Sequence, residues 1–453
     1  MAKKPEFASK IGLIAATVGS AVGLGNIWRF PAETQANGGA AFLLIYILCV
    51  FLLGVPVMSA EFSLGRAGRS DAIGAFKNTG GSKKWWAVGG LAILASYFIL
   101  WFYMVVAGWT LEYLFQSIGG SLYDFTAGMT EGEHFSRKMG EFISSGWNPL
   151  INTFLAIGIN LAILIVGVQK GIERLSNILM PLLFLILLIF CFVSLSLPGA
   201  SEGLAFFLNP DFSKITPTVA LNALGQAFFS LSLGMGILIT YSSYFPKETK
   251  LAKTAVTVSL LDLSVAFLMG LIIFPAVMSF HLEGEKLEGA TLIFVTLPEI
   301  FSKMSFTRLW SSLFFLLLSV AAITSTISIA EVTVAFLQDR FRMSRIKACL
   351  ATLLPLFLFS TICSLSQGPL SSITIFGKNI FDALDSLTTN ILLPLGALLL
   401  CIYLGWFAPK ALLKHELSNN GTIHSKFHNV IYFIIKYIAP VLIALVFISG
   451  LIR

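Results

Sequence analysis

The few polar side chains that interrupt the long apolar runs of this sequence could bind ions or small polar ligands. The deepest ionisable residues are Arg29, Glu61, Asp262 and Glu331, and a hydroxyl pair, Thr324-Ser325, lies within another apolar run. An ionisable group at membrane depth is costly and is by default a candidate for function. Amide, hydroxyl and carboxylate oxygens suit a hard cation such as sodium. The hydroxyls could instead bond back to the preceding helical turn.

Two glycine-containing segments share a pattern. GSAVGLGNIWRFP begins at Gly19, and SLSLGMG begins at Ser230. Each combines a serine with Gly-x-Gly inside an apolar run, and glycine costs a helix about 1 kcal/mol per residue and lets the backbone unwind. Unwound N–H groups suit a carboxylate, and unwound carbonyls suit a sodium ion. A single Gly-x-Gly would indicate close helix packing, but two at matching places predict a transporter site.

Composition indicates the elements that must position these residues. Of 453 residues, 56% are hydrophobic and 12% are charged, against about 25% charged in soluble domains. A helix crosses a bilayer with roughly 20 apolar residues, and FLLIYILCVFLLGVPVM lacks the alternation of a barrel strand. We expect an all-α polytopic membrane protein. Its eleven transmembrane helices, numbered as spans 1 to 11, are predicted at residues 11–36, 40–65, 86–117, 150–168, 174–196, 218–244, 254–281, 309–338, 345–366, 383–407 and 429–451.

Charge predicts the orientation and excludes several activities. Most of the 30 Lys and Arg fall in segments that a cytoplasmic N-terminus places inside, and an odd number of spans then puts the C-terminus outside. The net charge of +7 is thus a topology signal and not a nucleic-acid interface. The five cysteines lack metal-ligand spacing, and neither a phosphate-binding glycine loop nor a nucleophile elbow is present. We expect neither an enzyme nor an obligate protein partner, but contact with the lipid bilayer.

The sequence resembles the neurotransmitter:sodium symporter family along nearly its whole length. The resemblance rests on GSAVGLGNIWRFP, NGGAAFLLIYILCVFLLGVPVMSAEFSLGR, QAFFSLSLGMGILITYSSY, VTLPEIF and AAITSTISIAEVTVAFLQD. It implies a bacterial member in the cytoplasmic membrane, with a five-plus-five inverted repeat, unwound helices 1 and 6, and one extra C-terminal helix. The repeats would cover residues 1–200 and 201–407, and residues 408–453 would hold a cytoplasmic loop and span 11.

The resemblance also implies a set of site residues for sodium-coupled amino-acid uptake by alternating access. One sodium would bind Ala21, Asn26, Ser230, Asp262 and the substrate carboxylate; a second would bind Gly19, Val22, Ala321, Thr324 and Ser325. The substrate would contact Ala21, Leu24, Gly25, Ile99, Tyr103, Phe229, Ser230, Ser232, Met235, Ser325 and Ile329. Arg29 and Asp385 would form an outer gate under a lid of Tyr103 and Phe229, while Lys4 and Asp339 would form an inner gate with Phe7, Ser243 and Tyr244.

Two departures from the family pattern predict specificity. Tyr46 and Gln226 match two chloride-binding positions, but Ala266 replaces the span-7 serine and Asp262 replaces the usual asparagine. A fixed carboxylate would do the electrostatic work of chloride, so we expect chloride independence. Gly23 stands where amine-transporting relatives have an aspartate. An amino acid, which brings its own carboxylate, therefore fits better than an amine.

The predicted side-chain subsite is apolar and includes an adaptable methionine. Its residues Ile99, Phe229, Met235 and Ile329 favour uncharged hydrophobic amino acids. In span 5, Gly171 and Pro181 bracket nine residues, a spacing that predicts local unwinding during ion release or an ordinary proline kink.

Three other functions remain open at this point. A proton-coupled carrier on the same fold could use Asp262 or Glu61, and a sensor of the same architecture would bind an amino acid without flux. A channel is less compatible, because it should show a continuous polar face or rings of charge.

Overall fold

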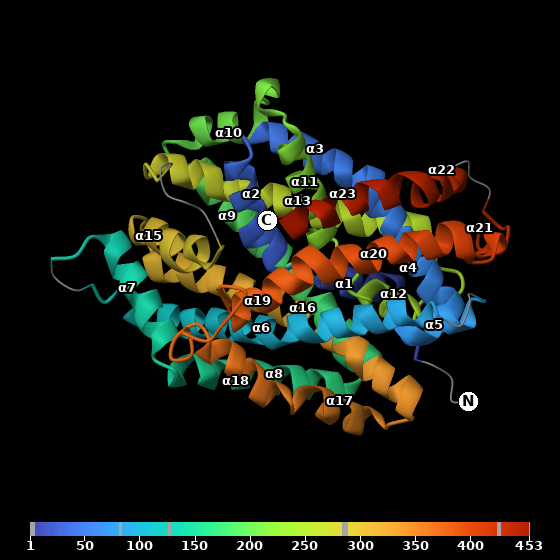
Figure 1. The fold of residues 1–453 in the computed structure, drawn as a ribbon. Helices are drawn as coiled ribbons and strands as arrows, with labels where there is room; N and C mark the ends of the chain where they lie inside the picture. Colours follow the sequence, from blue (N-terminus) through green and yellow to red (C-terminus); the bar gives the residue numbers. More distant parts are fainter. Residues whose placement is uncertain (1–4, 81–83, 126–127, 283–288, 424–426, 453) are drawn as a thin grey trace.

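A computed structural model describes residues 5–80, 84–125, 128–282, 289–423 and 427–452 (Figure 1). The described chain is almost entirely helical. Its strands, β1 (Thr374–Ile375) and β2 (Lys378–Asn379), form one short antiparallel hairpin. The predicted all-α polytopic class is therefore confirmed.

Nine continuous helices of the described chain are long and apolar enough to cross a membrane. They are Ala40–Gly68 (with α3, Ala40–Cys49, and α4, Val55–Gly68), Trp86–Gly119 (α6), Trp147–Val166 (α8), Val168–Leu195 (with α9, Arg174–Leu195), Leu251–Ser279 (α13), Thr307–Phe341 (α16), Arg345–Leu365 (α17, Arg345–Leu353, and α18, Leu356–Leu365), Ile380–Phe407 (with α19, Ile380–Ser386, and α20, Leu393–Ile402) and Phe427–Leu451 (α22, Phe427–Phe433, and α23, Ala439–Ile452).

Spans 1 and 6 are the two broken elements. Span 1 consists of α1 (Lys10–Ala21) and the segment Gly25–Ala36, which contains α2 (Phe30–Ala36), and the two parts are bent by 53°. Span 6 consists of α11 (Pro217–Ser230) and α12 (Ile237–Ser242), separated by six residues. Neither helix of span 6 reaches membrane-crossing length by itself. The predicted unwinding of both spans is thus observed, while the total of eleven spans and the inverted repeat stay predictions.

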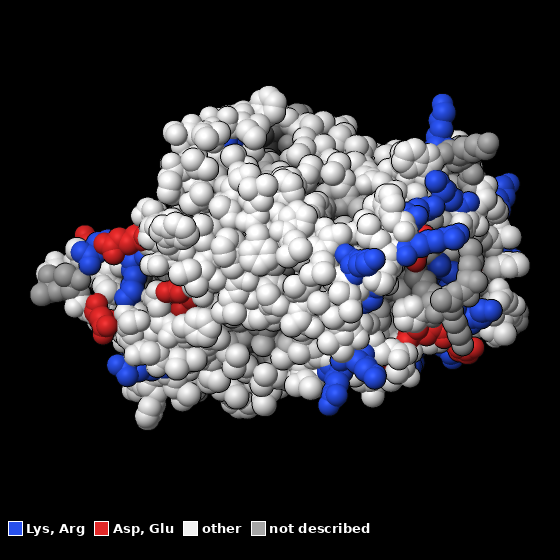
Figure 2. Space-filling model, turned by 90° about the horizontal axis from the view of Figure 1, so that it is seen from below, with Lys and Arg blue, Asp and Glu red and all other residues white. Residues whose placement is uncertain are grey.

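Shorter helices lie at the two ends of the molecule. The helices α7 (Glu131–Ser144) and α15 (Leu297–Ser302) lie at one end, called the α7 end. The helices α5 (Ala72–Asn78) and α21 (Lys410–Leu417) lie at the other, called the α5 end (Figure 1), where Glu6 also pairs with Arg69. Two further short helices are α10 (Ala200–Leu208) and α14 (Gly289–Thr291). In Figure 2 the α5 end is rich in Lys and Arg, the α7 end mixes both charges, and the surface between them is mostly uncharged. This distribution fits a membrane-spanning protein.

The core is built around α16 and the two broken spans. The most apolar stretch of α16 is 83% buried, the largest share of the described spans, and this helix packs against α1, α6, α9 and α12. Its sequence SVAAITSTISIA is rich in small residues, which lets helix backbones approach closely where lipid supplies no hydrophobic driving force between helices. Hydroxyl groups of α16 thereby reach the breaks.

Some predicted boundaries differ from the structure. Span 4 covers Trp147–Val166 in place of 150–168, because Gly167 at φ 102° ends its helix. Span 5 therefore begins at Val168, six residues earlier than predicted. The span-5 helix continues through Gly171 and Pro181, so the predicted unwinding is absent from this conformation. The segment 118–149 between two spans contains α7, whose first turn is closed by a capping box of Thr130 and Glu133.

Candidate functional site

The break in span 1 exposes backbone groups that side chains then satisfy. The helix α1 ends at Ala21, and Val22 is extended at φ −69° and ψ 109°. The Gly23 amide donates to Asn26 Oδ1 at 3.3 Å, and the Leu24 amide donates to the Tyr103 hydroxyl at 3.2 Å. The break is therefore a defined conformation with its own hydrogen bonds, as a binding site requires.

The break in span 6 is held by a buried carboxylate. Ser232, Gly234 and Gly236 have φ values of 54°, 80° and 73°, in the left-handed region that favours glycine. Glu61 Oε1 accepts from the Gly234 amide at 2.8 Å. A Cβ at Gly234 would lie 2.5 Å from the Leu393 carbonyl, so glycine is required there for close approach as well as for its φ.

Asn26, Ser230 and Asp262 meet between the two breaks. The Asn26 amide nitrogen donates to Ser230 Oγ and to Asp262 Oδ1, both at 2.9 Å, and Ser230 Oγ donates to Asp262 Oδ2 at 2.7 Å. Asp262 is fully buried. Among the described residues no Lys or Arg forms an ion pair with it. A buried carboxylate without a paired cation, next to the side-chain amide of Asn26 and the hydroxyl of Ser230, is suited to a hard monovalent cation.

A second oxygen cluster joins α16 to the end of α1. Ser325 Oγ donates towards the carbonyls of Val22 and Gly19 at 3.3 and 3.5 Å. Thr324 Oγ1 donates to Ala321 O at 3.1 Å and also bonds back to the preceding turn. All five oxygen donors predicted for the second sodium therefore come from two segments that touch each other.

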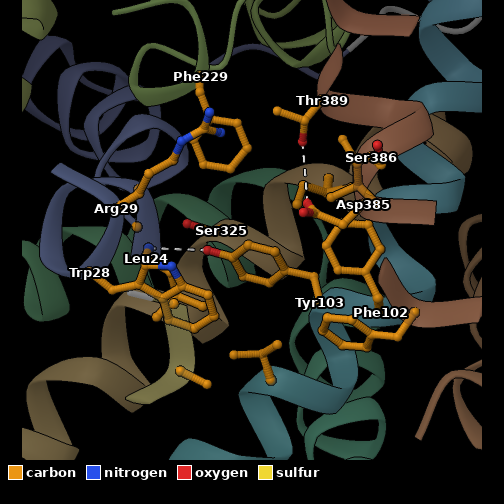
Figure 3. Close-up of a pocket in the computed structure, with 18 of the residues that line it drawn as sticks. Leu24, Trp28, Arg29, Phe102, Tyr103, Phe229, Ser325, Asp385, Ser386 and Thr389 are labelled. Carbon is orange, nitrogen blue, oxygen red and sulfur yellow. Dashed lines mark hydrogen bonds between the residues drawn. The ribbon is translucent and has the colours of Figure 1, made fainter. Parts of the chain in front are cut away.

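A cavity of about 660 Å³ opens next to both breaks (Figure 3). Its walls include every predicted substrate residue except Ser230: Ala21, Leu24, Gly25, Ile99, Tyr103, Phe229, Ser232, Met235, Ser325 and Ile329. The cavity continues towards the α7 end past residues that the sequence did not single out: Trp28, Phe102, Trp109, Gln367, Lys378, Phe381, Asp382 and Thr389. Four of these eight residues are aromatic and four are polar or charged, and this part of the cavity is the vestibule.

Arg29 and Asp385, the predicted outer gate, line the same cavity without forming an ion pair with each other. The Arg29 guanidinium lies 4.7 Å from the centre of the Phe229 ring, and Arg29 Nε lies 3.8 Å from Glu33 Oε1. Asp385 Oδ1 instead accepts from the Thr389 hydroxyl at 3.2 Å. Figure 3 shows Arg29 beside Phe229 and Asp385 beside Thr389. Arg29 and Asp385 therefore do not close the cavity as an ion pair in this structure.

The α5 end is closed around the predicted inner-gate residues. The Phe7 amide donates to Tyr244 O at 3.1 Å, and its ring packs edge-on against Tyr241 and Tyr244. Asp339 Oδ2 accepts from the Asp71 amide at 2.6 Å, and Ser243 is fully buried. Lys4, the other predicted member, lies outside the described residues.

Asp71 carries a perturbed carboxyl group at this end. It caps α5 by accepting from the amides of Ile73 and Gly74 at 2.9 and 3.3 Å. Burial raises the pKa of the Asp71 carboxyl above its ordinary value, although Arg340 Nε at 3.2 Å acts in the opposite direction.

Two buried acids have partners that the sequence did not reveal. Glu331 is fully buried and binds Arg345 in a bidentate pair at 2.6 and 2.7 Å. Glu173 accepts from the Ala8 amide at 2.8 Å, from the Ser9 amide at 3.0 Å and from the Ser9 hydroxyl at 2.9 Å. A search of the sequence for a cation to pair with Glu331 could have pointed to Arg345, because Arg345 is the first residue of the next predicted span.

Comparisons with known proteins show the family and the fold of the chain. The family model described as "Sodium:neurotransmitter symporter family" matches residues 4–129 and 132–453. An uncharacterized sodium-dependent transporter of Bacillus subtilis is 37% identical over 447 residues, covering 99% of this chain and 98% of the relative. One from Haemophilus influenzae is 38% identical over 459 residues, with 99% and 98% covered. The crystal structure of MhsT in complex with L-phenylalanine is 41% identical, with a TM-score of 0.89 over 99% of this chain and 100% of that one.

Proposed function

Since the chain belongs to the sodium:neurotransmitter symporter family and is a sodium-dependent symporter of the membrane, we propose that it imports uncharged hydrophobic L-amino acids. The observation that carries this proposal is the cavity beside the two breaks. Its walls include the apolar side chains of Ile99, Met235 and Ile329, while the breaks offer backbone and hydroxyl groups. The similarity to MhsT, whose structure holds L-phenylalanine, supports the same class of substrate.

Gly23 supports an amino acid over an amine. A Cβ at this position would lie 2.7 Å from Ser325 Oγ and 3.0 Å from the Tyr103 hydroxyl, so the break has no room for a side-chain carboxylate. An amine would lack an anionic partner at this point. An amino acid supplies its own carboxylate, which can accept hydrogen bonds from backbone amides near Gly25 and from the Tyr103 hydroxyl at the positive end of the second half-helix.

Two sodium ions would travel with the substrate. We assign the first to Ala21, Asn26, Ser230 and Asp262, because the buried Asp262 carboxylate needs a positive charge. We assign the second to the carbonyls of Gly19, Val22 and Ala321 and the hydroxyls of Thr324 and Ser325, which already converge. Every donor is an oxygen, and sodium, a hard cation, favours oxygen ligands.

Chloride independence follows from the same carboxylate. The Tyr46 hydroxyl donates to Ser230 Oγ at 3.2 Å, and the Gln226 amide donates to Gly25 O at 3.0 Å, so two residues matching chloride positions lie at the first ion site. Ala266 is one helical turn after Asp262 on α13 and brings no donor. The Asp262 charge takes over the compensation that an anion would otherwise provide.

In the proposed cycle the α7 end faces the outside of a bacterial cytoplasmic membrane and the closed α5 end faces the cytoplasm. Substrate and sodium enter by the vestibule, and Arg29 then approaches Asp385 above the lid of Tyr103 and Phe229. The contacts of Phe7 with Tyr244 open afterwards to release the cargo. This exchange of open ends is alternating access.

Uptake of each of the twenty amino acids into proteoliposomes tests the proposal, with an inward sodium gradient, fixed pH and gluconate in place of chloride. Concentrative uptake of a hydrophobic subset that disappears in choline is the expected result. Uptake that persists in choline and follows a pH gradient would favour proton coupling, for which Glu61 Oε2, a buried atom without a hydrogen-bond partner among the described residues, is the candidate. Sodium-dependent binding without flux would indicate a sensor.

A further inference from the structure

Lys436 is a lysine within span 11 that the transport site does not use. Its ammonium lies 4.7, 5.2 and 5.9 Å from the ring centres of Trp406, Tyr437 and Tyr432. Among the described residues, no carboxylate forms an ion pair with it and no acceptor takes a hydrogen bond from its Nζ. A lysine ammonium has three donors, and aromatic faces attract the charge without accepting these donors fully. The position therefore has unused capacity for an anion.

The backbone around Lys436 is fixed by span 10. The Trp406 indole donates to Lys436 O at 3.1 Å, and the Tyr432 hydroxyl donates to Gly405 O at 3.4 Å. A Cβ at Gly405 would lie 2.9 Å from Lys436 Cα, so this glycine permits close contact of the two spans. Lys436 thus lies level with the last turn of span 10, at the α5 end, although it is nine residues into span 11.

The surface around this ammonium has the character of a membrane interface. Trp406, Phe433 and Tyr437 are 58%, 53% and 47% exposed. Exposed Trp and Tyr gather at the level of lipid headgroups. The helix α21, which packs against α22 (Figure 1), adds the exposed Lys410 and Lys414 at the same end of the molecule.

The acid on α21 does not cancel this positive charge. Glu416 Oε2 lies 2.5 Å from Arg66 Nε, so its charge is already paired. The local balance is therefore positive, and it is complementary to an anionic group.

An apolar stripe continues from the lysine along span 11. Tyr437, Val441, Leu445 and Ile448 are 47%, 60%, 47% and 50% exposed. Their spacing of four, four and three residues puts them on one face of a helix. A headgroup at Lys436 would place an acyl chain along this face.

We propose that Lys436, with Trp406 and Tyr437, forms a binding site for a phospholipid with an anionic headgroup. The ammonium binds the phosphate diester, the rings pack beside the glycerol region, and the stripe on α23 receives an acyl chain. A second copy of the chain is less suited to this face, because an apolar partner helix would leave the ammonium without an acceptor. A bound lipid would hold spans 10 and 11 together at the α5 end.

Thermal unfolding of the purified, delipidated full-length protein in detergent tests the site. Phosphatidylglycerol should raise the unfolding midpoint of the wild type more than phosphatidylcholine does. Lys436→Met should weaken the apparent affinity for phosphatidylglycerol about fivefold, the effect of one lysine near an anionic lipid surface. Lys253→Met is the matched control, because Lys253 is exposed at the α5 end of α13.

The outcomes separate lipid from other occupants. An undiminished phosphatidylglycerol response in Lys436→Met overturns the site, as does an equal response to phosphatidylcholine. If sodium phosphate shifts the unfolding midpoint as much as phosphatidylglycerol does, the site binds free phosphate and the lipid proposal is overturned. If the protein forms a dimer without lipid and Lys436→Met disrupts that dimer, the occupant is a second copy of the chain and the lipid proposal is again overturned. If Lys436→Met does not fold, a photoactivatable phosphatidylglycerol on the wild type decides the matter: adducts within 403–448 support the site, and adducts confined to other segments overturn it.

Discussion

Replacing Gly23 with alanine tests whether the break in span 1 is the binding site. The added Cβ would lie 2.7 Å from Ser325 Oγ and 3.0 Å from the Tyr103 hydroxyl, below the 3.4 Å at which ordinary contact begins. Ser325 must move by about 0.7 Å or rotate away. Either response weakens the hydrogen bond from Ser325 Oγ to the Val22 carbonyl oxygen, two atoms that are 3.3 Å apart. A single methyl group therefore disturbs the substrate site and the second sodium site together.

Overpacking by one methyl group costs about 1–3 kcal/mol. Because about 1.4 kcal/mol corresponds to tenfold in affinity, we expect Gly23→Ala to bind substrate roughly 5- to 150-fold more weakly at saturating sodium. Gly158→Ala is the control, since a Cβ at Gly158 in α8 meets nothing within 4 Å. That variant should bind like the wild type.

The assay is equilibrium binding of the radiolabelled amino acid that the wild type takes up best, with the unfolding midpoint of each variant measured in parallel. The variant Ser325→Ala removes the atom nearest to the new Cβ but leaves the Tyr103 hydroxyl 3.0 Å from it. Adding Gly23→Ala to Ser325→Ala should therefore weaken binding by a smaller factor than Gly23→Ala weakens it in the wild type. Wild-type affinity in a folded Gly23→Ala protein would refute the location of the site. Strictly additive losses in the double variant would refute the contact with Ser325.

Three further changes test other parts of the structure. Asp262→Asn removes the fixed carboxylate, so sodium-driven uptake should become dependent on chloride when chloride and gluconate are compared; uptake equal in both anions would contradict the role of Asp262. Glu173→Ala removes the acceptor of three hydrogen bonds from residues 8 and 9, so hydrogen exchange at residues 8–13 should accelerate at least tenfold while exchange in α13 stays unchanged. The pKa of Asp71 is raised in the folded protein, so ionisation of this group lowers the stability as the pH rises above its ordinary pKa of about 4. The unfolding midpoint of Asp71→Asn should therefore increase relative to that of the wild type between about pH 4 and pH 7. A difference that stays constant over this range would contradict the raised pKa.

The breaks were the most predictable part of the site. Glycines at 23, 25, 234 and 236 disfavour a continuous helix. The structure interrupts span 1 at Val22 and Gly23, with Gly25 beginning the helix again, and it interrupts span 6 at residues 231–236. The lining of the cavity was predictable for a related reason, since family motifs mark the residues at the breaks. The vestibule was not, because Phe102 and Phe381 look like ordinary apolar helix residues until the tertiary fold turns them inward.

Contacts between distant segments could not be read from the sequence. Glu61 was visible as a costly buried acid, but its bond to the Gly234 amide joins residues 173 positions apart. The partner of Glu331 depends on the turn at residues 342–344, which folds Arg345 back onto α16. The intact span-5 helix shows a similar limit, because glycine and proline permit unwinding and only the conformational state decides whether it occurs.

The position of Arg29 over the Phe229 ring has a consequence for how the protein is balanced. The 4.7 Å contact is worth about 0.5–2 kcal/mol as a cation–π interaction. In the proposed cycle Arg29 leaves this ring to approach Asp385, so the contact favours the arrangement seen here over the closed one by that amount. A cargo molecule that packs beneath the same ring therefore needs to supply only a modest difference in binding energy to invert the populations. The contact between Arg29 and Phe229 is thus weak enough for substrate binding to reverse this preference.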